Sequence, residues 1–314
     1  MTSVPVLYIV FNRLDTVKQS FEAVRSAQPS RLYLAADGPR KNRKGEAERC
    51  EEVRQWVLSH IDWNCEVHRR FQKENVGCGH HPADAITWLF ENEESGIILE
   101  DDCVASSSFF PFAAEMLEKY KDDHQVSIVC GSNFDVSHRF QPEEADYFFS
   151  KISYTWGWAT WKRSWKDYDF TMTDWGRINK SRLLRWLFTD PEYREYWRYI
   201  FDETLAKQPT DIWDYQFFFL CYRNRRLAIV PAVNLISNIG IGTDATHTTE
   251  SSDSMGVSLQ ELTFPLKHAM GKVVNEAYDG LVQEKCYGRV PVIPLFTKLK
   301  RRIKKLFSNY KAHA

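Results

Sequence analysis

The chain has 314 residues, of which 43% are hydrophobic and 26% charged, so its composition is that of a globular protein with a sizeable core. The 41 Lys and Arg residues nearly balance the 42 Asp and Glu residues, which excludes the strongly basic character of most nucleic-acid-binding proteins. The seven Cys residues form no CxxC pair and are odd in number, so neither a zinc knuckle nor a disulfide framework is expected and a cytoplasmic location is predicted.

Strand and helix patterns alternate along the first hundred residues. Short apolar runs predict strands at residues 6–11, 31–36, 64–71 and 96–99. Segments with helical spacing of apolar residues predict helices at 16–25, 46–60 and 82–91. Such alternation is typical of an α/β fold with a mostly parallel, Rossmann-like sheet flanked by helices. The first apolar run is too short to span a bilayer and has no charged leader, so we expect no signal peptide.

Polar groups follow three of these predicted strands. They are Asn12-Arg13, Asp37 and the triplet Glu100-Asp101-Asp102. Ligands bind beyond the carboxyl ends of the strands in parallel sheets, so we expect the three ends to converge on one crevice.

The acidic triplet indicates a divalent cation. Adjacent carboxylates repel one another and raise each other's pKa, and a bound Mn²⁺ or Mg²⁺ removes that cost. The alternative is a solvated acidic turn without a ligand. Because side chains alternate along a strand, one carboxylate of the triplet can hold the metal while another anchors sugar or ribose hydroxyls.

The section from about 107 to 230 has a different pattern. Bulky apolar faces predict helices at 109–120, 182–188 and 191–205, and a strand is expected at 227–233. The aromatic cluster 154–161 lies between them. The turn-rich stretch 238–247 has the composition of a loop that closes over a site.

Several motifs in this order resemble one family. The strand before Glu100-Asp101-Asp102 and the motif Trp213-Asp214-Tyr215 resemble those of GT-A glycosyltransferases similar to N-acetylglucosaminyltransferase I, and of related bacterial surface-polysaccharide glycosyltransferases. The resemblance covers most of residues 4–250. The chain differs from the eukaryotic members in lacking a membrane anchor and a lumenal stem, and the acceptor half also differs.

The resemblance implies a GT-A type fold with an acceptor-side subdomain and assigns roles by position. Asp214 is the implied catalytic base, and Asp102 and His247 are the implied metal contacts. The implied donor-binding residues are Asn12, Arg13, Asp37 (on the uracil edge), Glu100 and Asp101. Trp156 and Trp158 are expected on the acceptor side.

Each of these roles has a simpler alternative. Asp214 can cap the helix that begins near residue 215, and Asp211 is a rival for the base. His247 can be an ordinary exposed histidine, and Arg13 an ordinary surface cation. The Trp156/Trp158 cluster can belong to the core. The pair His80-His81 has no Cys partner nearby and indicates a helix start or a donor contact rather than a second metal.

The C-terminal segment is basic and amphipathic. Its cations are Lys298, Lys300, Arg301, Arg302, Lys304, Lys305 and Lys311. Apolar residues fall near one helical face, a pattern typical of a helix on an anionic membrane surface, although packing on the domain is the alternative. We therefore expect a nucleotide-sugar-binding half at 1–106, an acceptor-binding and catalytic half at 107–285 within the same compact domain, and a tail at 286–314 that can attach peripherally to the inner membrane face.

The sequence thus predicts a metal-dependent, inverting glycosyltransferase. The expected cofactor is Mn²⁺ or Mg²⁺, the donor a nucleotide sugar with UDP favoured, and the acceptor a glycan or lipid-linked oligosaccharide in surface-polysaccharide synthesis. The alternatives are a sugar nucleotidyltransferase, which would need a Gly-rich phosphate loop where residues 12–15 stand, and a non-catalytic nucleotide-sugar binding module. A two-metal phosphohydrolase would need further His or Asp ligands.

Overall fold

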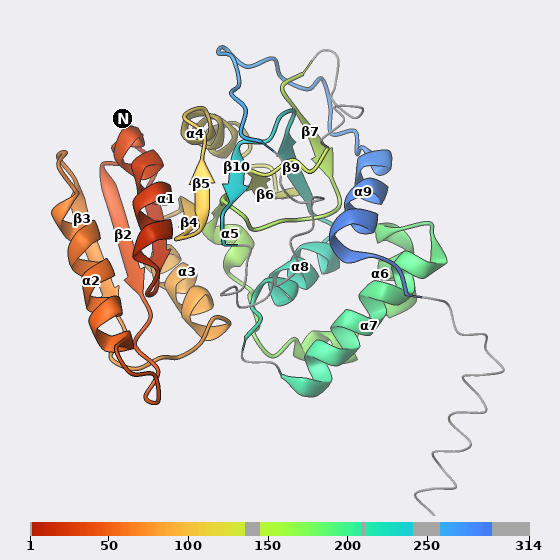
Figure 1. Ribbon diagram of the computed structural model, residues 1–314. Coiled ribbons are helices and arrows are strands. Elements are labelled where there is room, and N and C mark those ends of the chain that lie inside the picture. The colour runs from red at the N-terminus through yellow and green to blue at the C-terminus, as the bar shows by residue number, and fades with distance from the viewer. Residues whose placement is uncertain (1, 136–144, 209–210, 241–257, 291–314) are drawn as a thin grey trace, which may run out of the picture.

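The computed structural model describes residues 2–135, 145–208, 211–240 and 258–290, and its centre is an eight-stranded sheet (Figure 1). Across the sheet the strands are β3 (Glu66–Phe71), β2 (Arg31–Ala36), β1 (Val6–Val10), β4 (Ser95–Glu100), β8 (Trp158–Trp161), β6 (Val126–Cys130), β9 (Leu227–Pro231) and β7 (Tyr147–Ser150). Only β8 and β7 run against the other six. This confirms the predicted α/β class with a mostly parallel sheet flanked by helices.

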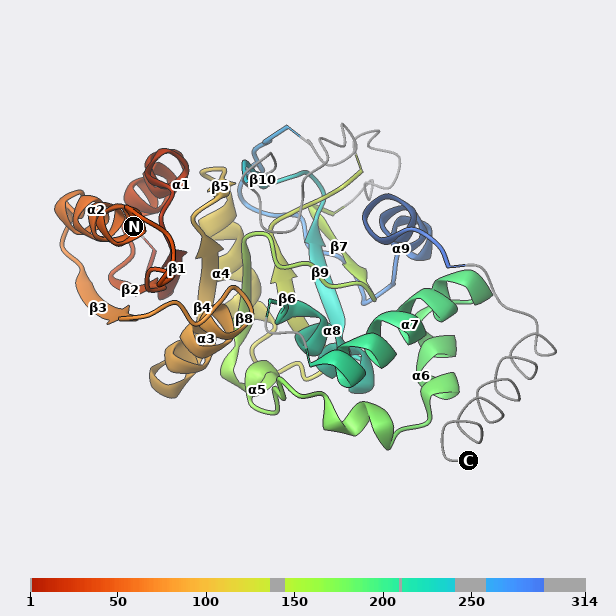
Figure 2. The same cartoon turned by 60° about the horizontal axis from the view of Figure 1, so that its bottom comes forward.

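Helices cover both faces of this sheet, as two views show (Figures 1 and 2). One face carries α1 (Leu14–Ala27), α2 (Glu46–Ser59) and α4 (Phe109–Lys119). The other carries α3 (His80–Asn92), α5 (Lys162–Trp165) and α8 (Asp214–Arg223). Behind α8 lie η1 (Thr173–Gly176), α6 (Lys180–Leu187) and α7 (Pro191–Lys207), and α9 (Glu276–Val282) continues into η2 (Gln283–Tyr287).

The hydrophobic core has two parts, one on each face of the sheet, because successive side chains of a strand point to opposite faces. In β1, Leu7 and Ile9 pack with the α3 and α8 side, whereas Val6, Tyr8 and Val10 pack with the α1 and α4 side. All five residues are buried, as expected for a parallel strand that is covered on both faces. A continuous apolar run, rather than an alternating one, is therefore the sequence signal of this strand.

A small second sheet lies next to the acidic triplet. It pairs β5 (Cys103–Ala105) with β10 (Ile236–Asn238), and Asn238 is opposite Cys103. This pairing brings the stretch after residue 236 beside the end of β4. The described part of that stretch ends at Gly240, and the rest of the turn-rich segment, with His247, lies outside the described residues.

The sheet runs through the boundary between the two halves expected from the sequence. β8 lies between β4 of the first half and β6 of the second, and η2 passes residue 285, where the tail was expected to start. The basic segment from residue 291 lies outside the described residues. Within the described part of the chain, no helix has both the length and the apolar character needed to cross a bilayer.

Candidate active site

A cleft of about 760 Å³ lies where β1, β2 and β4 end. The polar residues expected to converge there all line it, namely Asn12, Arg13, Asp37, Glu100, Asp101 and Asp102. The opposite wall comes from the start of α8 and from the segments around residues 154–156 and 286–287. The parallel register explains the convergence, because β1 pairs with β2 up to Val10 opposite Ala36 and with β4 up to Ile9 opposite Glu100.

Asp37 is held almost entirely by the protein itself. Its carboxylate accepts hydrogen bonds from the backbone N–H groups of Gly38 (2.7 Å), Val76 (3.0 Å) and Gly77 (3.1 Å), and from Asn75 Nδ2 (2.8 Å). A carboxylate offers about four acceptor positions, and these bonds fill them. Asp37 thus fixes the turn at residues 75–77 along the cleft, and its expected contact with a nucleobase stays a prediction.

Asn12 is fixed by a buried carboxylate that sequence reasoning missed. Asn12 Nδ2 donates to Glu46 Oε1 (3.0 Å), and Glu46 also accepts from the backbone N–H of Arg40 (2.7 Å) and from its guanidinium. Arg40 lines the cleft, and its guanidinium lies 5.6 Å from the ring of Phe11. Glu46 therefore orients two cleft-lining side chains. Glu46 makes these contacts as the first residue of α2, and no local sequence pattern predicts them.

Arg13 binds two members of the acidic triplet. Its Nη2 donates to Asp101 Oδ1 (2.7 Å) and to Asp102 Oδ2 (2.9 Å). The other oxygen of Asp101 accepts from the N–H of Phe11 (3.2 Å). Arg13 thus provides positive charge beside the triplet. An ordinary surface cation, which was the alternative for Arg13, would not make these two bonds.

The negative charge of the triplet is only partly compensated. Burial, together with the charges of Asp102, Asp101 and Asp214, raises the pKa of Glu100 to about 8. Burial and Asp102 raise the pKa of Asp101 to about 6, although Arg13 opposes this shift. The charge of Asp214 acts on Glu100, so the two walls of the cleft influence each other electrostatically.

The stability of the metal-free protein is expected to fall as the pH rises from about 4.5 to about 8. Native Glu100 keeps its proton up to a pKa of about 8, whereas unfolded chains lose it near the ordinary value of 4.5. In this window the native state binds more protons, so the free energy of unfolding decreases with pH. Melting temperatures in EDTA across this range test the trend. Glu100→Gln should flatten the curve, and an unchanged slope in that variant would contradict this origin.

The donor set suits a hard divalent cation. Carboxylate oxygens are the ligands that Mg²⁺ and Mn²⁺ prefer, and a cation would offset the cost of ionising Glu100 and Asp101, whose pKa values are raised by burial and by the neighbouring carboxylates. No group of three or more His, Cys, Asp or Glu side chains in the described ranges has the geometry of a preformed metal site. Asp102 would hold the ion as one protein ligand among few, and donor phosphates would supply others.

The segment after β10 contacts Asp102 directly. Asn238 Nδ2 lies 3.4 Å from Asp102 Oδ1, and the N–H of Ile239 donates to the backbone carbonyl of Asp102 (2.8 Å). Gly240 follows so closely that a Cβ there would overlap the Asp102 carboxylate, so only glycine fits. The late loop therefore starts at the predicted metal ligand. The predicted contact of His247 lies beyond the described part of this loop.

Asp214 is the first residue of α8 and faces the cleft. Its Oδ1 accepts from the N–H of Tyr215 (2.9 Å), so it does take part in the local start of the helix. Asp211 also lines the cleft, and its backbone carbonyl accepts from Cys78 Sγ (3.5 Å), which joins the two walls. Both acidic candidates for the base thus remain in the cleft, with Asp214 the one whose charge acts on Glu100.

The two tryptophans expected on the acceptor side have different positions. Trp156 lines the cleft and packs against Phe134 (ring centroids 5.6 Å apart). Trp158 is completely buried in β8 and stacks on Trp213 (5.9 Å), so its expected acceptor contact is wrong. Gly157, with a φ of 55°, breaks the strand alternation between them, which explains why residues two apart do not share a side.

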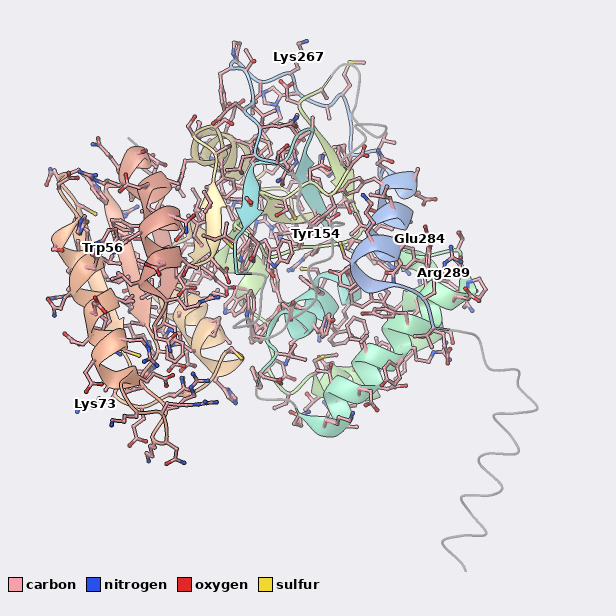
Figure 3. All side chains as sticks on the ribbon, in the orientation of Figure 1. Trp56, Lys73, Tyr154, Lys267, Glu284 and Arg289 are labelled. Carbon is pink, nitrogen blue, oxygen red and sulfur yellow. The ribbon has the colours of Figure 1, made fainter. Side chains whose placement is uncertain are left out.

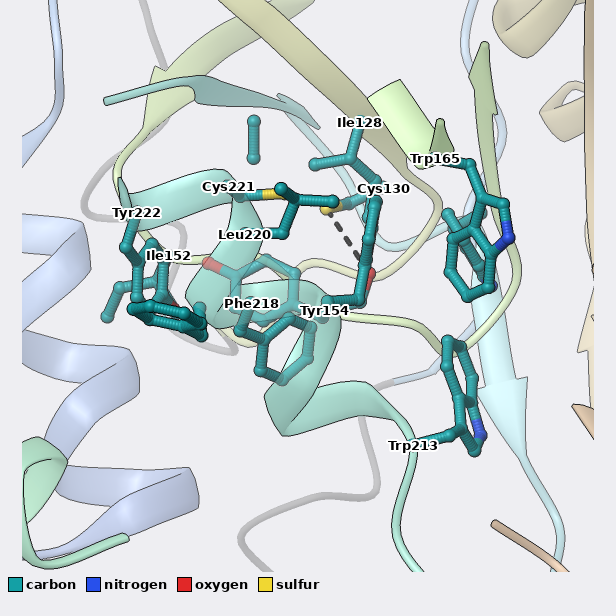
Figure 4. Close-up of a cluster of buried hydrophobic side chains, with 14 of the residues drawn as sticks. Ile128, Cys130, Ile152, Tyr154, Trp165, Trp213, Phe218, Leu220, Cys221 and Tyr222 are labelled. Carbon is teal, nitrogen blue, oxygen red and sulfur yellow. Dashed lines mark hydrogen bonds between the residues drawn. The ribbon is translucent and has the colours of Figure 1, made fainter. Parts of the chain in front are cut away.

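The wall behind Trp213 is an aromatic core (Figure 4). Trp165, Trp213 and Phe218 pack around the start of α8, and the backbone carbonyl of Tyr154 accepts from Cys130 Sγ (3.6 Å). Tyr168 OH donates to the carbonyl of Trp213 (2.9 Å) and stacks on Trp165 (4.1 Å). This packing fixes the residue before Asp214 and so limits where its carboxylate can point.

His81 is a cleft residue that sequence reasoning left open. It is buried in the first turn of α3 and lines the cleft. Burial lowers the pKa of the imidazole, although the charges of Asp37 and Asp84 and a hydrogen bond with the backbone of Ala35 oppose this. The imidazole has two ring nitrogens, so a ligand in the cleft can bind the one that does not face Ala35.

Solved structures resemble this chain only at low sequence identity. No protein-family profile matches the chain, and no curated protein sequence matches it. Among solved structures, S. aureus TarS 1-349 has a TM-score of 0.44 and 11% identity over 75% of this chain and 59% of that one. The mannosyltransferase PcManGT from Pyrobaculum calidifontis, in complex with GDP-Man and Mn²⁺, has a TM-score of 0.39 and 12% identity over 71% and 69%. HddC from Yersinia pseudotuberculosis has a TM-score of 0.33 and 12% identity over 52% and 80%.

Proposed function

We propose that this chain is a metal-dependent, inverting glycosyltransferase that moves a sugar from a nucleotide-diphosphate donor, with UDP favoured, to a hydroxyl of a glycan or lipid-linked acceptor. The observation that carries this proposal is the placement of carboxylates on both walls of one cleft. Asp101 and Asp102 follow the end of β4 and are bound by the guanidinium of Arg13, and Asp214 lies on the opposite, aromatic wall. Transfer needs one acidic group for the leaving diphosphate's metal and another for the attacking hydroxyl.

The donor belongs at the end of the cleft formed by β1 and β2. Arg13 and Arg40 supply guanidinium groups suited to phosphate oxygens, and Asn12 supplies an amide held in place by Glu46. Asp37, the turn that it fixes and the imidazole of His81 line this end of the cleft, where a base or ribose would bind. When bound, a divalent ion at Asp102 would stabilise the negative charge of the leaving diphosphate.

The acceptor belongs at the aromatic end. Asp214 would accept the proton of the attacking hydroxyl, and Trp156 would offer an aromatic face to a sugar ring. A single base on the wall opposite the leaving diphosphate favours direct displacement and thus inversion. The transferred sugar would be a hexosyl or N-acetylhexosaminyl group used in surface-polysaccharide synthesis.

The C-terminal segment would bring the enzyme to its acceptor. Seven Lys and Arg residues without an acidic one between 291 and 314 are suited to the anionic inner face of a membrane. Arg289 ties the chain before this segment to α7 through Tyr193 OH (3.0 Å) and Asp190 (3.3 Å), and lies next to Glu284 (Figure 3). Tyr287, two residues before Arg289, lines the cleft on the wall assigned to the acceptor.

The test is thermal stabilisation by a panel of nucleotide sugars with and without Mn²⁺. A matching donor at 100 times its Kd should add about 2.7 kcal/mol to the free energy of unfolding. UDP-sugars should raise the melting temperature of the protein only when Mn²⁺ is present. Release of UDP should require an acceptor hydroxyl or water. A binding module would show stabilisation without turnover, and a nucleotidyltransferase would release pyrophosphate from a nucleoside triphosphate and a sugar phosphate. Donor binding that is equally strong in EDTA would contradict the metal role.

A further inference from the structure

Arg13 holds two carboxylates through a single nitrogen. Its Nη2 donates to both Asp101 Oδ1 and Asp102 Oδ2. The side chain of Arg13 is 32% exposed, against 7% for Asp101 and 17% for Asp102, so the pair is largely shielded from water on the carboxylate side. In such surroundings an unpaired carboxylate is costly, and Arg13 compensates both.

The two carboxylates differ in how firmly their surroundings hold them. Asp101 also accepts from the N–H of Phe11 (3.2 Å), and its backbone carbonyl accepts from Ser20 Oγ (2.8 Å). The carboxylate of Asp102 has only long contacts apart from Arg13, to Asn238 Nδ2 (3.4 Å) and Cys103 Sγ (3.6 Å), although its backbone carbonyl accepts from the N–H of Ile239 (2.8 Å). The bond from Arg13 to Asp102 is therefore the one that can be exchanged without disturbing the end of β4.

The rest of the guanidinium is available to a ligand. Nε and Nη1 of Arg13 make no hydrogen bond with the described residues, and the side chain lines the cleft. Arg has five N–H donors in a planar fork, which matches the oxygens of a phosphate group. Arg13 can thus bind Asp101 with one nitrogen while its other nitrogens face the cleft.

We propose that Arg13 is an internal counter-ion that competes with the divalent metal for Asp102 and, once displaced, turns its free nitrogens to the diphosphate of the donor. This inference rests on the proposed function. Two cations that share one carboxylate oxygen at low exposure repel each other, so binding of the metal weakens the bond from Arg13 to Asp102. The diphosphate then replaces the lost partner, which links binding of metal and donor and favours an ordered addition of metal before donor.

The test measures Mn²⁺ and UDP separately in Arg13→Gln. Mn²⁺ binding to the donor-free protein is followed by electron paramagnetic resonance of the free ion, and UDP binding at saturating Mn²⁺ by calorimetry. Removal of the competitor should lower the Kd for Mn²⁺ about tenfold, and loss of the phosphate contact should raise the Kd for UDP about tenfold. Opposite signs are the signature of exchange, because a merely structural role for Arg13 would weaken both.

Two further variants keep the test decisive. Arg25→Gln removes the same charge from the far end of α1, where Arg25 pairs with Asp62, and should change neither Kd by more than about twofold. Arg13→Lys keeps the counter-ion if the Gln variant does not fold. It should leave the Kd for Mn²⁺ within about threefold of the original and raise the Kd for UDP, because Lys has no fork.

The possible failures are distinct. If Arg13→Gln binds Mn²⁺ with unchanged or lower affinity while Asp102→Asn abolishes that binding, the exchange is wrong and the proposed function stands. If the unaltered protein binds no Mn²⁺ either alone or with UDP, the metal role and the exchange fail together. A weaker affinity for Mn²⁺ in Arg13→Lys would also overturn the exchange.

Discussion

Asp214→Asn is expected to lower kcat for sugar transfer about 10³-fold while the Kd for the donor stays within about twofold. The amide has the shape of the carboxylate but cannot accept the proton of the attacking hydroxyl. It can still accept the hydrogen bond from the N–H of Tyr215, so the start of α8 is preserved. The N-cap position of α8 is occupied by Trp213 and not by Asp214, so the variant separates the loss of a base from the loss of a helix cap. Initial rates with a matched donor and acceptor measure the effect.

The neighbouring carboxylate provides the matched comparison for this variant. Asp211→Asn changes the same group three residues earlier in the same cleft. If Asp214 is the base, the Asp211 variant should lose less than about tenfold in kcat. A large loss in Asp211→Asn with near-normal rates in Asp214→Asn would transfer the role to Asp211. A loss of melting temperature in Asp214→Asn that parallels the loss of activity would identify a capping residue instead.

The residues of the donor half of the cleft could be predicted from the sequence, because neighbouring parallel strands end at the same edge of the sheet. Buried runs end just before Asn12, Asp37 and Glu100, and the carboxyl ends of parallel neighbours share one edge. The helix and strand boundaries there needed only local patterns, as in β2, whose bounds were predicted at residues 31–36. The convergence of these residues therefore follows from short-range information combined with one topological rule.

The acceptor half does not follow such a rule. β8 lies antiparallel between β4, about sixty residues earlier in the chain, and β6, about thirty residues earlier, and no local pattern encodes either pairing. The sequence Trp158–Trp161 has no alternation because both faces of this strand are buried. Trp158 and Trp156 could not be told apart by spacing, since the positive φ of Gly157 changes their directions.

The contacts that hold the site were not predictable for a similar reason. A strand-terminal Asp predicts a ligand contact, but no local pattern shows that the turn at residues 75–77 returns to Asp37 and donates to it. Glu46 and His81 enter the site through the geometry of the starts of α2 and α3. Residues that hold a site, or that only tertiary packing brings into it, carry no sequence signal of their own.

Asp102→Asn is expected to abolish the Mn²⁺-dependent rise in melting temperature and to lower kcat/KM at least about 10³-fold. The amide oxygen is a weaker ligand for a hard cation, and the neighbouring carboxylate of Asp101 is already held by Phe11 and Arg13. The metal-free melting temperature should change little, because Arg13 keeps its bond to Asp101. Thermal unfolding with and without Mn²⁺, together with initial rates, measures both effects.

The matched variant for this prediction is Asp101→Asn, which should show the opposite behaviour. Asp101 is the more deeply buried of the two carboxylates and also accepts from the N–H of Phe11, so Asn in its place loses the ion pair with Arg13 and weakens the bond to the end of β1. Arg13 keeps its bond to Asp102, so the cost is below the roughly 3 kcal/mol of a fully broken buried pair, and the metal-free melting temperature should fall more than in Asp102→Asn. The Mn²⁺ response should persist, because Asp102 remains. If Asp101→Asn instead abolishes the Mn²⁺ response while Asp102→Asn retains it, Asp101 is the metal ligand, one residue nearer to the end of β4.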